Sequence, residues 1–289
     1  MLIGTWSGAG NVGDELLTGW AIRQVRARGG DLVVTSVDPA TTRRIHGPVA
    51  TVPWGIRPLP RDVRVDAVVV GPGGIIQDTS SVWSLPAHLA RALHARRRGL
   101  PVAGVGLGAE PLRRGISRRL VAAAFSGAVG VTVRDEESAA ALAGADVAAR
   151  VAPDVVFDEV GPADRVPAEH RRGLVVAAGP HVRPGRLRPA RRRLVADPVD
   201  EVAAAVEAVA AHVEGPVTLV AFRGERDREW LARLAARVPG ARLDDGTDPG
   251  RARRLVTGAA AVVSSRLHPC VLAVAAGVPC LAVSTQAKV

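Results

Sequence analysis

The sequence predicts an α/β protein with two doubly wound domains that face each other across a cleft. Short apolar, β-branched segments alternate with segments of helical length, which is typical of parallel sheets covered on both faces. Glycine-rich or polar turns follow several of these strands, where open α/β sheets bind ligands. A length of 289 residues suits two domains. We place them at 1–165 and 166–289, because residues 161–172 are rich in proline and charge and resemble a linker.

The first domain is predicted to alternate strands and helices from its first residue. Strands are expected at 1–6, 32–36, 66–70, 101–105 and 129–133, which are short apolar runs. Helices are expected at 14–28, 85–98 and 117–126, with a short one that ends at Leu142. The glycine-rich segments 71–74 and 106–108 are expected to be turns that follow two of the strands.

The second domain is predicted to repeat this pattern. Strands are expected at 173–178, 217–222, 259–263 and 280–283, and helices at 199–213, 227–238 and 270–276. The Arg- and Pro-rich run 183–193 has no apolar period and is expected to be a loop. Pro269 is expected to open the last helix, so that residues 264–268 form a polar turn before it.

Composition and charge narrow the class of partner. The formal net charge of +10 indicates an anionic partner, such as a phosphorylated metabolite, a lipid-linked acceptor, a membrane surface or nucleic acid. We do not expect nucleic acid, because no aromatic stacking residues lie among the arginine clusters. No signal peptide or membrane span is recognisable, and the two cysteines suit core thiols in a reducing cytosol. We therefore expect a cytoplasmic protein that acts at the inner face of the cell membrane.

Two glycine-rich turns in the first domain are candidate ligand loops. In the turn at residues 8–15, Asn11 and Asp14 can hydrogen-bond a sugar or cap the helix that follows, and the sequence leaves these alternatives equal. In the turn at residues 71–80, Gln77 and Asp78 can read hydroxyl groups. The alternative there is a capping box before the next helix.

Three basic side chains are candidates for binding an anion. Arg134 directly follows a predicted strand and can bind a carboxylate or phosphate with its fork of N–H groups, or can pair with a neighbouring acidic residue. His268 follows Ser265 and Arg266 in a polar turn, and the helix N-terminus after this turn favours binding of an anion. Taken alone, His268 could equally be a structural histidine. Lys288 is the sole lysine of the chain.

These turns, in this order, resemble the polysaccharide pyruvyl transferase family, whose members include bacterial enzymes that decorate cell-wall polymers. The resemblance spans nearly the whole chain and rests on five segments: 10–15, 73–81, 133–138, 152–157, and 265–268 with 277–279. It implies a fold of two Rossmann-like domains of the GT-B type. It also implies transfer of pyruvate from phosphoenolpyruvate onto two hydroxyls of one sugar as a cyclic ketal, with no metal and no cofactor beyond this donor substrate.

The resemblance also implies roles for individual residues. His268 is expected to be the general acid, and the donor is expected to be held by Arg134, Lys288, Arg266 and Ser265. The acceptor, a cell-envelope saccharide that is lipid-linked, is expected to bind Asn11, Gly13, Asp14, Glu15, Gly74, Gln77 and Asp78. The chain has Thr285-Gln286-Ala287 where the family has Tyr-Asp-Pro, and it stops soon after Lys288, so the C-terminal domain is expected to be shortened.

Two alternatives fit the same architecture. One is a sugar-nucleotide glycosyltransferase of the GT-B type, in which Asp244 and Asp245 would hold the nucleotide ribose. The other is a non-catalytic relative that binds envelope saccharides without turning them over.

Overall fold

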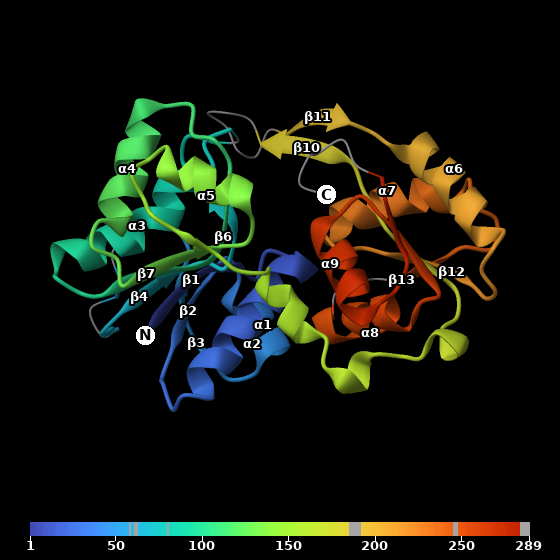
Figure 1. The fold of residues 1–289 in the computed structure, drawn as a ribbon, viewed down its shortest axis with the longest axis horizontal. Coiled ribbons are helices and arrows are strands. Elements are labelled where there is room, and N and C mark those ends of the chain that lie inside the picture. The colour runs from blue at the N-terminus through green and yellow to red at the C-terminus, as the bar shows by residue number, and fades with distance from the viewer. Residues whose placement is uncertain (58, 61–62, 80, 185–191, 245–247, 284–289) are drawn as a thin grey trace. The chain divides into compact units, whose positions relative to one another are not determined.

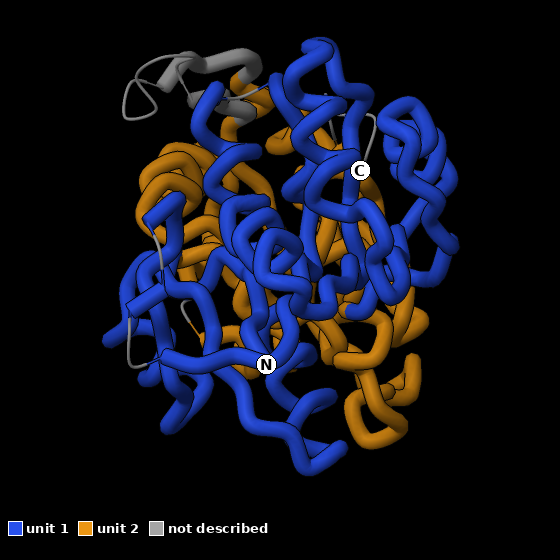
Figure 2. The backbone as a smooth tube through the Cα atoms, turned by 90° about the vertical axis from the view of Figure 1, so that its left-hand side faces the viewer, with its two compact units in different colours: residues 1–9, 17–155, 184–192 blue, residues 10–16, 156–183, 193–289 orange. Residues whose placement is uncertain are grey.

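The computed structural model describes residues 1–289 except 58, 61–62, 80, 185–191, 245–247 and 284–289 (Figure 1). The chain divides into two compact units (Figure 2). Unit 1 comprises residues 1–9, 17–155 and 184–192, and unit 2 comprises residues 10–16, 156–183 and 193–289. Residues 10–16, near the N-terminus, thus belong to unit 2. None of the helices within the described ranges is long and apolar enough to cross a membrane.

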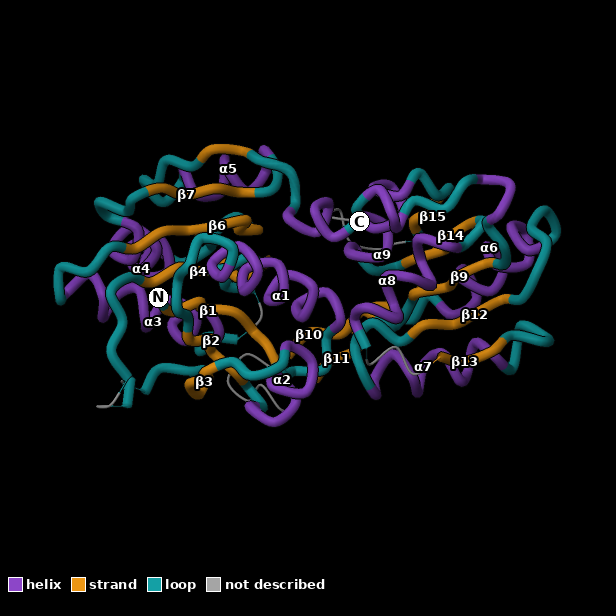
Figure 3. The backbone as a smooth tube through the Cα atoms, turned by 90° about the horizontal axis from the view of Figure 1, so that it is seen from below, coloured by secondary structure: helices purple, strands orange, loops and turns teal. Residues whose placement is uncertain are grey.

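Unit 1 contains a sheet whose paired strands are all parallel. Its strands are β1 (Leu2–Ser7), β2 (Val33–Ser36), β3 (Ala50–Pro53), β4 (Val68–Val70), β5 (Gly73–Ile76), β6 (Val102–Ala109), β7 (Gly130–Val133) and β8 (Arg150–Val151). They lie in the order β3-β2-β1-β4-β6-β7-β8, with β5 paired to β6. Figure 3 labels β3, β2, β1, β4, β6 and β7 of this order. Because β2 lies on one side of β1 and β4 on the other, the chain reverses direction across the sheet between β1 and β4. Ligands bind at the carboxyl ends of the strands at such a point.

The helices of unit 1 pack on this sheet through apolar faces. They are α1 (Val12–Arg26), α2 (Pro39–His46), α3 (Ser84–Arg97), α4 (Gly115–Phe125) and α5 (Glu136–Ala143), of which α1 begins in unit 2. Leu85 and Leu89 of α3 and Val121 of α4 join Leu2 and Val70 of the sheet in one buried cluster. Burial of these side chains removes apolar surface from water and fixes the sheet that carries the candidate loops.

Unit 2 is built around a second parallel sheet, in the order β13-β12-β9-β14-β15. Its strands are β9 (Leu174–Ala177), β12 (Val217–Val220), β13 (Arg242–Asp244), β14 (Ala261–Ser264) and β15 (Cys280–Ala282). A separate two-stranded sheet is formed by β10 (His181–Pro184) and β11 (Arg192–Ala196). The helices are α6 (Val199–Ala210), α7 (Glu225–Ala235), α8 (Pro249–Gly258) and α9 (Leu267–Ala276), and short 3-10 turns lie at Val155–Glu159, Pro162–Asp164 and Ala168–His170.

Alternate residues of the central strands of unit 2 face α6 and α7. Leu174 and Val176 of β9 and Val263 of β14 pack with Val202 of α6 and Trp230 of α7 in a buried cluster. This alternation follows from the two-residue period of a strand. The predicted α/β class with parallel sheets is confirmed in both units.

Several expected boundaries are wrong, and each has a physical reason. Residues 106–108 are not a turn, because β6 continues through Leu107, which is fully buried and pairs with β5 and β7. The segment 71–74 likewise enters β5 at Gly73. The last helix begins at Leu267, so His268 lies in its first turn. In the run 183–193, predicted as a loop, both flanks belong to β10 and β11, and residues 185–191 lie outside the described residues.

Candidate active site

Hydrogen bonds within the segment 10–16 order the start of α1. The Asn11 side chain donates to Asp14 Oδ2 over 2.6 Å, and its own amide oxygen accepts the backbone N–H of Gly13 over 3.1 Å. The backbone N–H of Val12 donates to the carbonyl of Phe222, which follows β12. The same hydrogen bonds that order the start of α1 also hold the Asn11 and Asp14 side chains in place.

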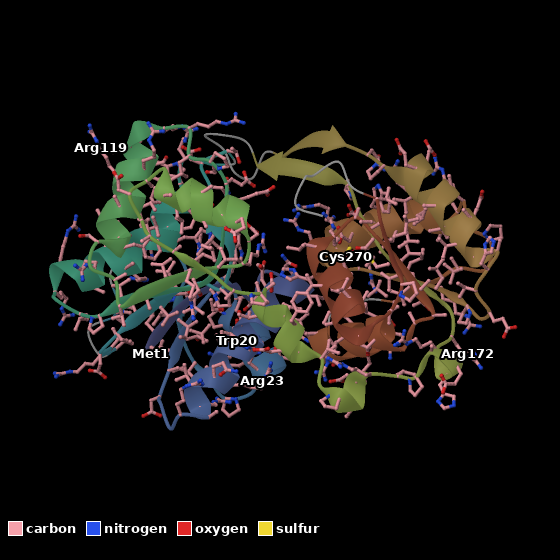
Figure 4. All side chains as sticks on the ribbon, in the orientation of Figure 1. Met1, Trp20, Arg23, Arg119, Arg172 and Cys270 are labelled. Carbon is pink, nitrogen blue, oxygen red and sulfur yellow. The ribbon has the colours of Figure 1, made fainter. Side chains whose placement is uncertain are left out.

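His268 packs directly against Gly13 within unit 2. A methyl group on Gly13 would lie only 2.0 Å from Nδ1 of His268, so glycine leaves the space that the imidazole fills. His268 is half-buried in the first turn of α9. Figure 4 labels Cys270, which lies on the same helix two residues further on. The N–H groups of this first turn provide positive potential next to the imidazole.

The turn that leads into α9 is fixed by hydrogen bonds and an ion pair. Ser264, fully buried, donates to the carbonyl of Ala177 over 2.7 Å and accepts the backbone N–H of Arg266 over 2.9 Å. The Ser265 hydroxyl accepts the N–H of Gly179 over 3.1 Å. Ser264 thus binds the turn to the last residue of β9, and Ser265 binds it to the segment that follows β9.

Arg266, predicted to bind the donor, is paired with Asp227 of α7. Its Nε donates to Asp227 Oδ2 over 3.2 Å, and its Nη2 donates to Oδ1. Asp227 is completely buried and also accepts the N–H of Arg223 over 2.9 Å. Gly179 lies against the pair so closely that a methyl group there would clash with both partners. The guanidinium therefore holds the start of α9, two residues before His268.

Arg134, in unit 1, lies flat against glycine backbone. A methyl group on Gly108 would lie 2.8 to 3.0 Å from Nη2, Cζ and Nε of Arg134, and one on Gly74 would lie 3.4 Å from Nη2. Asp154 and Asp135 each approach the guanidinium to 3.4 Å. Nη1 of Arg134 donates to Asp154 Oδ2 at this distance, and both ion pairs are longer than the contacts from Arg266 to Asp227.

The polar loop after β5 is ordered by its own side chains. Gln77 Oε1 accepts both the backbone N–H and the hydroxyl of Thr79, and that hydroxyl also lies 2.9 Å from Glu110 Oε2 at the end of β6. Asp78 is buried and accepts the backbone N–H groups of Arg113 and Arg114 over 3.1 and 2.9 Å. Burial raises the pKa of Asp78, but these hydrogen bonds outweigh it and hold its pKa below the usual value.

The structure groups the predicted residues in two sets. In unit 2 it brings Asn11, Gly13 and Asp14 together with His268, and Glu15 is buried in the same turn of α1. In unit 1 it brings Gly74 to Arg134. The predicted donor ligand Lys288 lies outside the described residues.

Three acidic residues that contact the predicted side chains or their neighbours were assigned no role from the sequence. Asp154 beside Arg134 lies three residues after β8, in a segment that carries the family resemblance, and an acidic residue near the end of a strand was the available signal. Glu110 follows β6 in the same way. Asp227 gave no signal, because it lies among exposed acidic and basic residues of α7 and only the fold shows that it is buried.

A family model described as polysaccharide pyruvyl transferase matches residues 11–286. The chain belongs to the polysaccharide pyruvyl transferase family. This match begins at Asn11 and includes Arg134 and His268, so it spans both clusters. None of the curated proteins compared matches the sequence at a significant level.

Solved structures similar to this pyruvyl transferase family member have the GT-B type of fold. A putative UDP-N-acetylglucosamine 2-epimerase from Listeria monocytogenes has a TM-score of 0.60 at 11% identity, over 97% of this chain and 78% of its own. The S. aureus MnaA–UDP co-structure has a TM-score of 0.59 at 10% identity, over 98% and 78%. The Neisseria meningitidis UDP-GlcNAc 2-epimerase bound to UDP-GlcNAc has 0.58 at 10%, over 99% and 83%. At these identities the similarity extends to the fold alone.

Proposed function

We propose that this transferase moves pyruvate from phosphoenolpyruvate onto two hydroxyls of one sugar and forms a cyclic ketal. The packing of His268 against Gly13 carries the proposal, because it joins two segments of the family match within one unit. The imidazole, a side chain that can act as a general acid, thus lies against the segment that holds Asn11 and Asp14, the candidates for binding sugar hydroxyls.

The chemistry requires one acid and a means of holding anions. His268 gives a proton to the methylene carbon of phosphoenolpyruvate, which leaves a cationic centre at the carbon that carries the phosphate. One sugar hydroxyl adds to this carbon, and the carbon–phosphate oxygen bond breaks. The second hydroxyl then closes the ring. Of the two hydroxyl protons, one returns to the imidazole and the other leaves with inorganic phosphate, so protons balance over the cycle.

Cationic groups hold the donor in this proposal. Arg134 suits the carboxylate, because its guanidinium lies flat on Gly108 and its ion pairs with Asp135 and Asp154 are long, at 3.4 Å each. Lys288 and the N–H groups that begin α9 are proposed for the phosphate. The Arg266–Asp227 pair favours a positioning role for Arg266 over direct contact with the donor.

The acceptor is proposed to be a cell-envelope saccharide or its lipid-linked precursor, used at the inner face of the membrane. The net charge of +10 supports attraction to lipid phosphates. Asn11, Asp14, Gln77 and Thr79 supply groups that can bind hydroxyls.

The test is to incubate the purified protein with phosphoenolpyruvate and lipid-linked saccharides. We expect phosphate release together with a product whose mass has increased by one pyruvyl ketal. Turnover with nucleotide sugars alone would overturn the proposal in favour of a glycosyltransferase. Saccharide binding that His268→Ala leaves intact, with no phosphate released by the wild-type protein, would instead indicate a non-catalytic binding protein.

A further inference from the structure

Two tryptophans and a histidine form a stacked cluster in unit 1, outside the residues discussed above. The rings of Trp6 and Trp54 lie 4.9 Å apart between centroids and 26° from parallel. The His88 ring lies 5.4 Å from Trp6 and 5.3 Å from Trp54. The chain has five tryptophans, three phenylalanines and no tyrosine. Two of these eight aromatic residues therefore lie in this one cluster.

The cluster lies at the edge of the sheet where ligands bind. Trp6 is the penultimate residue of β1, and Trp54 directly follows β3. Both strands run parallel to their neighbours, so both residues lie at the carboxyl edge. Trp6 also lies next to the point between β1 and β4 where the chain reverses direction across the sheet.

Trp54 is held in place by a buried arginine. Arg91 of α3 donates to the carbonyl of Pro53 over 3.1 Å and to the carbonyl of Arg57, which brackets Trp54 on both sides. The backbone N–H of Trp54 donates to the carbonyl of Ser36 over 2.8 Å. These hydrogen bonds fix the backbone around Trp54, and a surface fixed before binding reduces the entropy lost on binding.

Trp6 nevertheless remains open to solvent. Its neighbours in β1, Thr5 and Ser7, are buried, whereas 36% of Trp6 is exposed. A tryptophan that only filled the core would be covered, because burying its large apolar surface is favourable. Burial lowers the pKa of His88 to about 4, so the cluster is uncharged at neutral pH. An uncharged aromatic surface suits the C–H face of a sugar ring better than it suits an anion.

We propose that Trp6, supported by Trp54 and His88, is a stacking subsite for a sugar ring of the acceptor. Gln77 and Thr79, which lie past the end of β5, are at the same carboxyl edge. Adjacent strands are about 4.8 Å apart, so β1 and β6 are separated by roughly 10 Å across β4. A saccharide of two or more rings can therefore lie on Trp6 and reach the polar loop. This inference rests on the proposed function, whose acceptor it specifies.

The test is direct binding of saccharides to the full chain, measured without phosphoenolpyruvate. The probes are the methyl pyranosides of glucose, galactose and mannose and of their 2-acetamido derivatives, detected by saturation-transfer NMR. We expect transfer to ring C–H protons in the wild type and roughly a tenfold loss of affinity in Trp6→Ala, as expected for a lost aromatic stack. Trp6→Phe should retain most of the binding. Val129→Ala, an exposed apolar residue that precedes β7 at the opposite edge, is the matched control.

The outcomes separate this inference from the proposed function. Saccharide binding that depends on Trp6, with no turnover of phosphoenolpyruvate, would support the subsite and contradict the transfer reaction. Saturation transfer to the saccharides that is unchanged in Trp6→Ala would overturn the subsite. So would the absence of any saturation transfer in the wild-type protein. Unfolding temperatures of all variants, followed by circular dichroism, show whether a loss reflects misfolding, and Trp6→Phe decides the question if Trp6→Ala does not fold.

Discussion

The contact between Gly13 and His268 is the feature of the candidate site that depends most on a single residue. The imidazole occupies the volume that any larger side chain at position 13 would need. The sequence singled out both residues, because each lies in a polar turn after a strand. It could not show that they touch, because they are 255 positions apart in the sequence and only the fold brings the first turn of α1 to α9.

Gly13→Ala is therefore expected to displace His268 and to reduce pyruvyl transfer at least tenfold while the protein remains folded. A misplaced acid loses most of the advantage of its orientation. The measurement is the rate of ketal formation, with the unfolding temperature recorded in parallel. Gly19→Ala, in the same helix, is the control, because a methyl group there meets only the flexible ends of Arg23 and His46 at 3.3 to 3.6 Å. Equal activity of the two variants would contradict the contact.

His88 makes stability depend on pH in a predictable direction. Burial lowers its folded pKa to about 4, below the value of about 6.5 for an unfolded histidine. The unfolded chain therefore binds the proton more readily, and the stabilisation present above pH 6.5 is lost as the pH falls towards 4. The group alone should remove about 2 kcal/mol of unfolding free energy between pH 7 and pH 5.

The measurement for His88 is urea unfolding of wild type and His88→Phe across this range. The variant should lose less stability than the wild type as the pH falls, because its ring does not titrate. The matched control is His94→Gln, which removes an exposed histidine of the same helix and should behave as the wild type does. Parallel curves for wild type and His88→Phe would show that burial does not lower the pKa of His88.

At the scale of elements, the start of α9 depends on the ion pair between Arg266 and Asp227. Arg266 is the N-cap residue of α9, and Asp227 lies in the first turn of α7, so the pair joins two helices of unit 2. Removing one member of a buried pair leaves the other charge without compensation, which costs far more than breaking an exposed pair.

Asp227→Asn is expected to destabilise unit 2 by about 3 to 5 kcal/mol. Asp200→Asn, which removes the exposed partner of Arg237, should cost about 1 kcal/mol or less. Chemical denaturation of both variants gives the comparison. If Asp227→Asn is as stable as Asp200→Asn, then Arg266 does not hold α9 and its guanidinium is available to the donor, as the sequence prediction has it.

Two helices absent from the predictions show which local signals went unused. Both α2 and α8 begin with an Asp-Pro pair, Asp38-Pro39 and Asp248-Pro249. In each, the aspartate side chain accepts a backbone N–H of the first turn and the proline occupies the start of the helix. By contrast, the extension of β6 through Gly106 to Gly108 had no local signal, because pairing with β5 and β7 decides it.

At the scale of the whole molecule, the sequence predicted the α/β class and the parallel sheets, since alternating strand and helix patterns extend over most of the chain. The family followed from the resemblance of five short segments. It could not predict the division of residues between units. Residues 10–16 are remote in sequence from the rest of unit 2 and join it through contacts such as Val12 with Phe222. Arg134 belongs to unit 1 and His268 to unit 2.

The net charge of +10 predicts a property of the full chain. It should bind vesicles of phosphatidylcholine that contain phosphatidylglycerol, and salt should release it, because screening weakens attraction between exposed charges. Co-sedimentation at low and high salt measures this. Equal binding to vesicles of phosphatidylcholine alone, or no binding to either, would remove the support that charge gives to a membrane-associated acceptor.

Proton delivery to the enol phosphate is tested most directly by running the reaction with phosphoenolpyruvate in heavy water. If an exchangeable group on His268 protonates the methylene carbon, the ketal methyl group will carry solvent deuterium, and His268→Ala will abolish ketal formation while the exposed His212→Ala will not. A ketal methyl group free of deuterium, or undiminished product from His268→Ala, would contradict this mechanism.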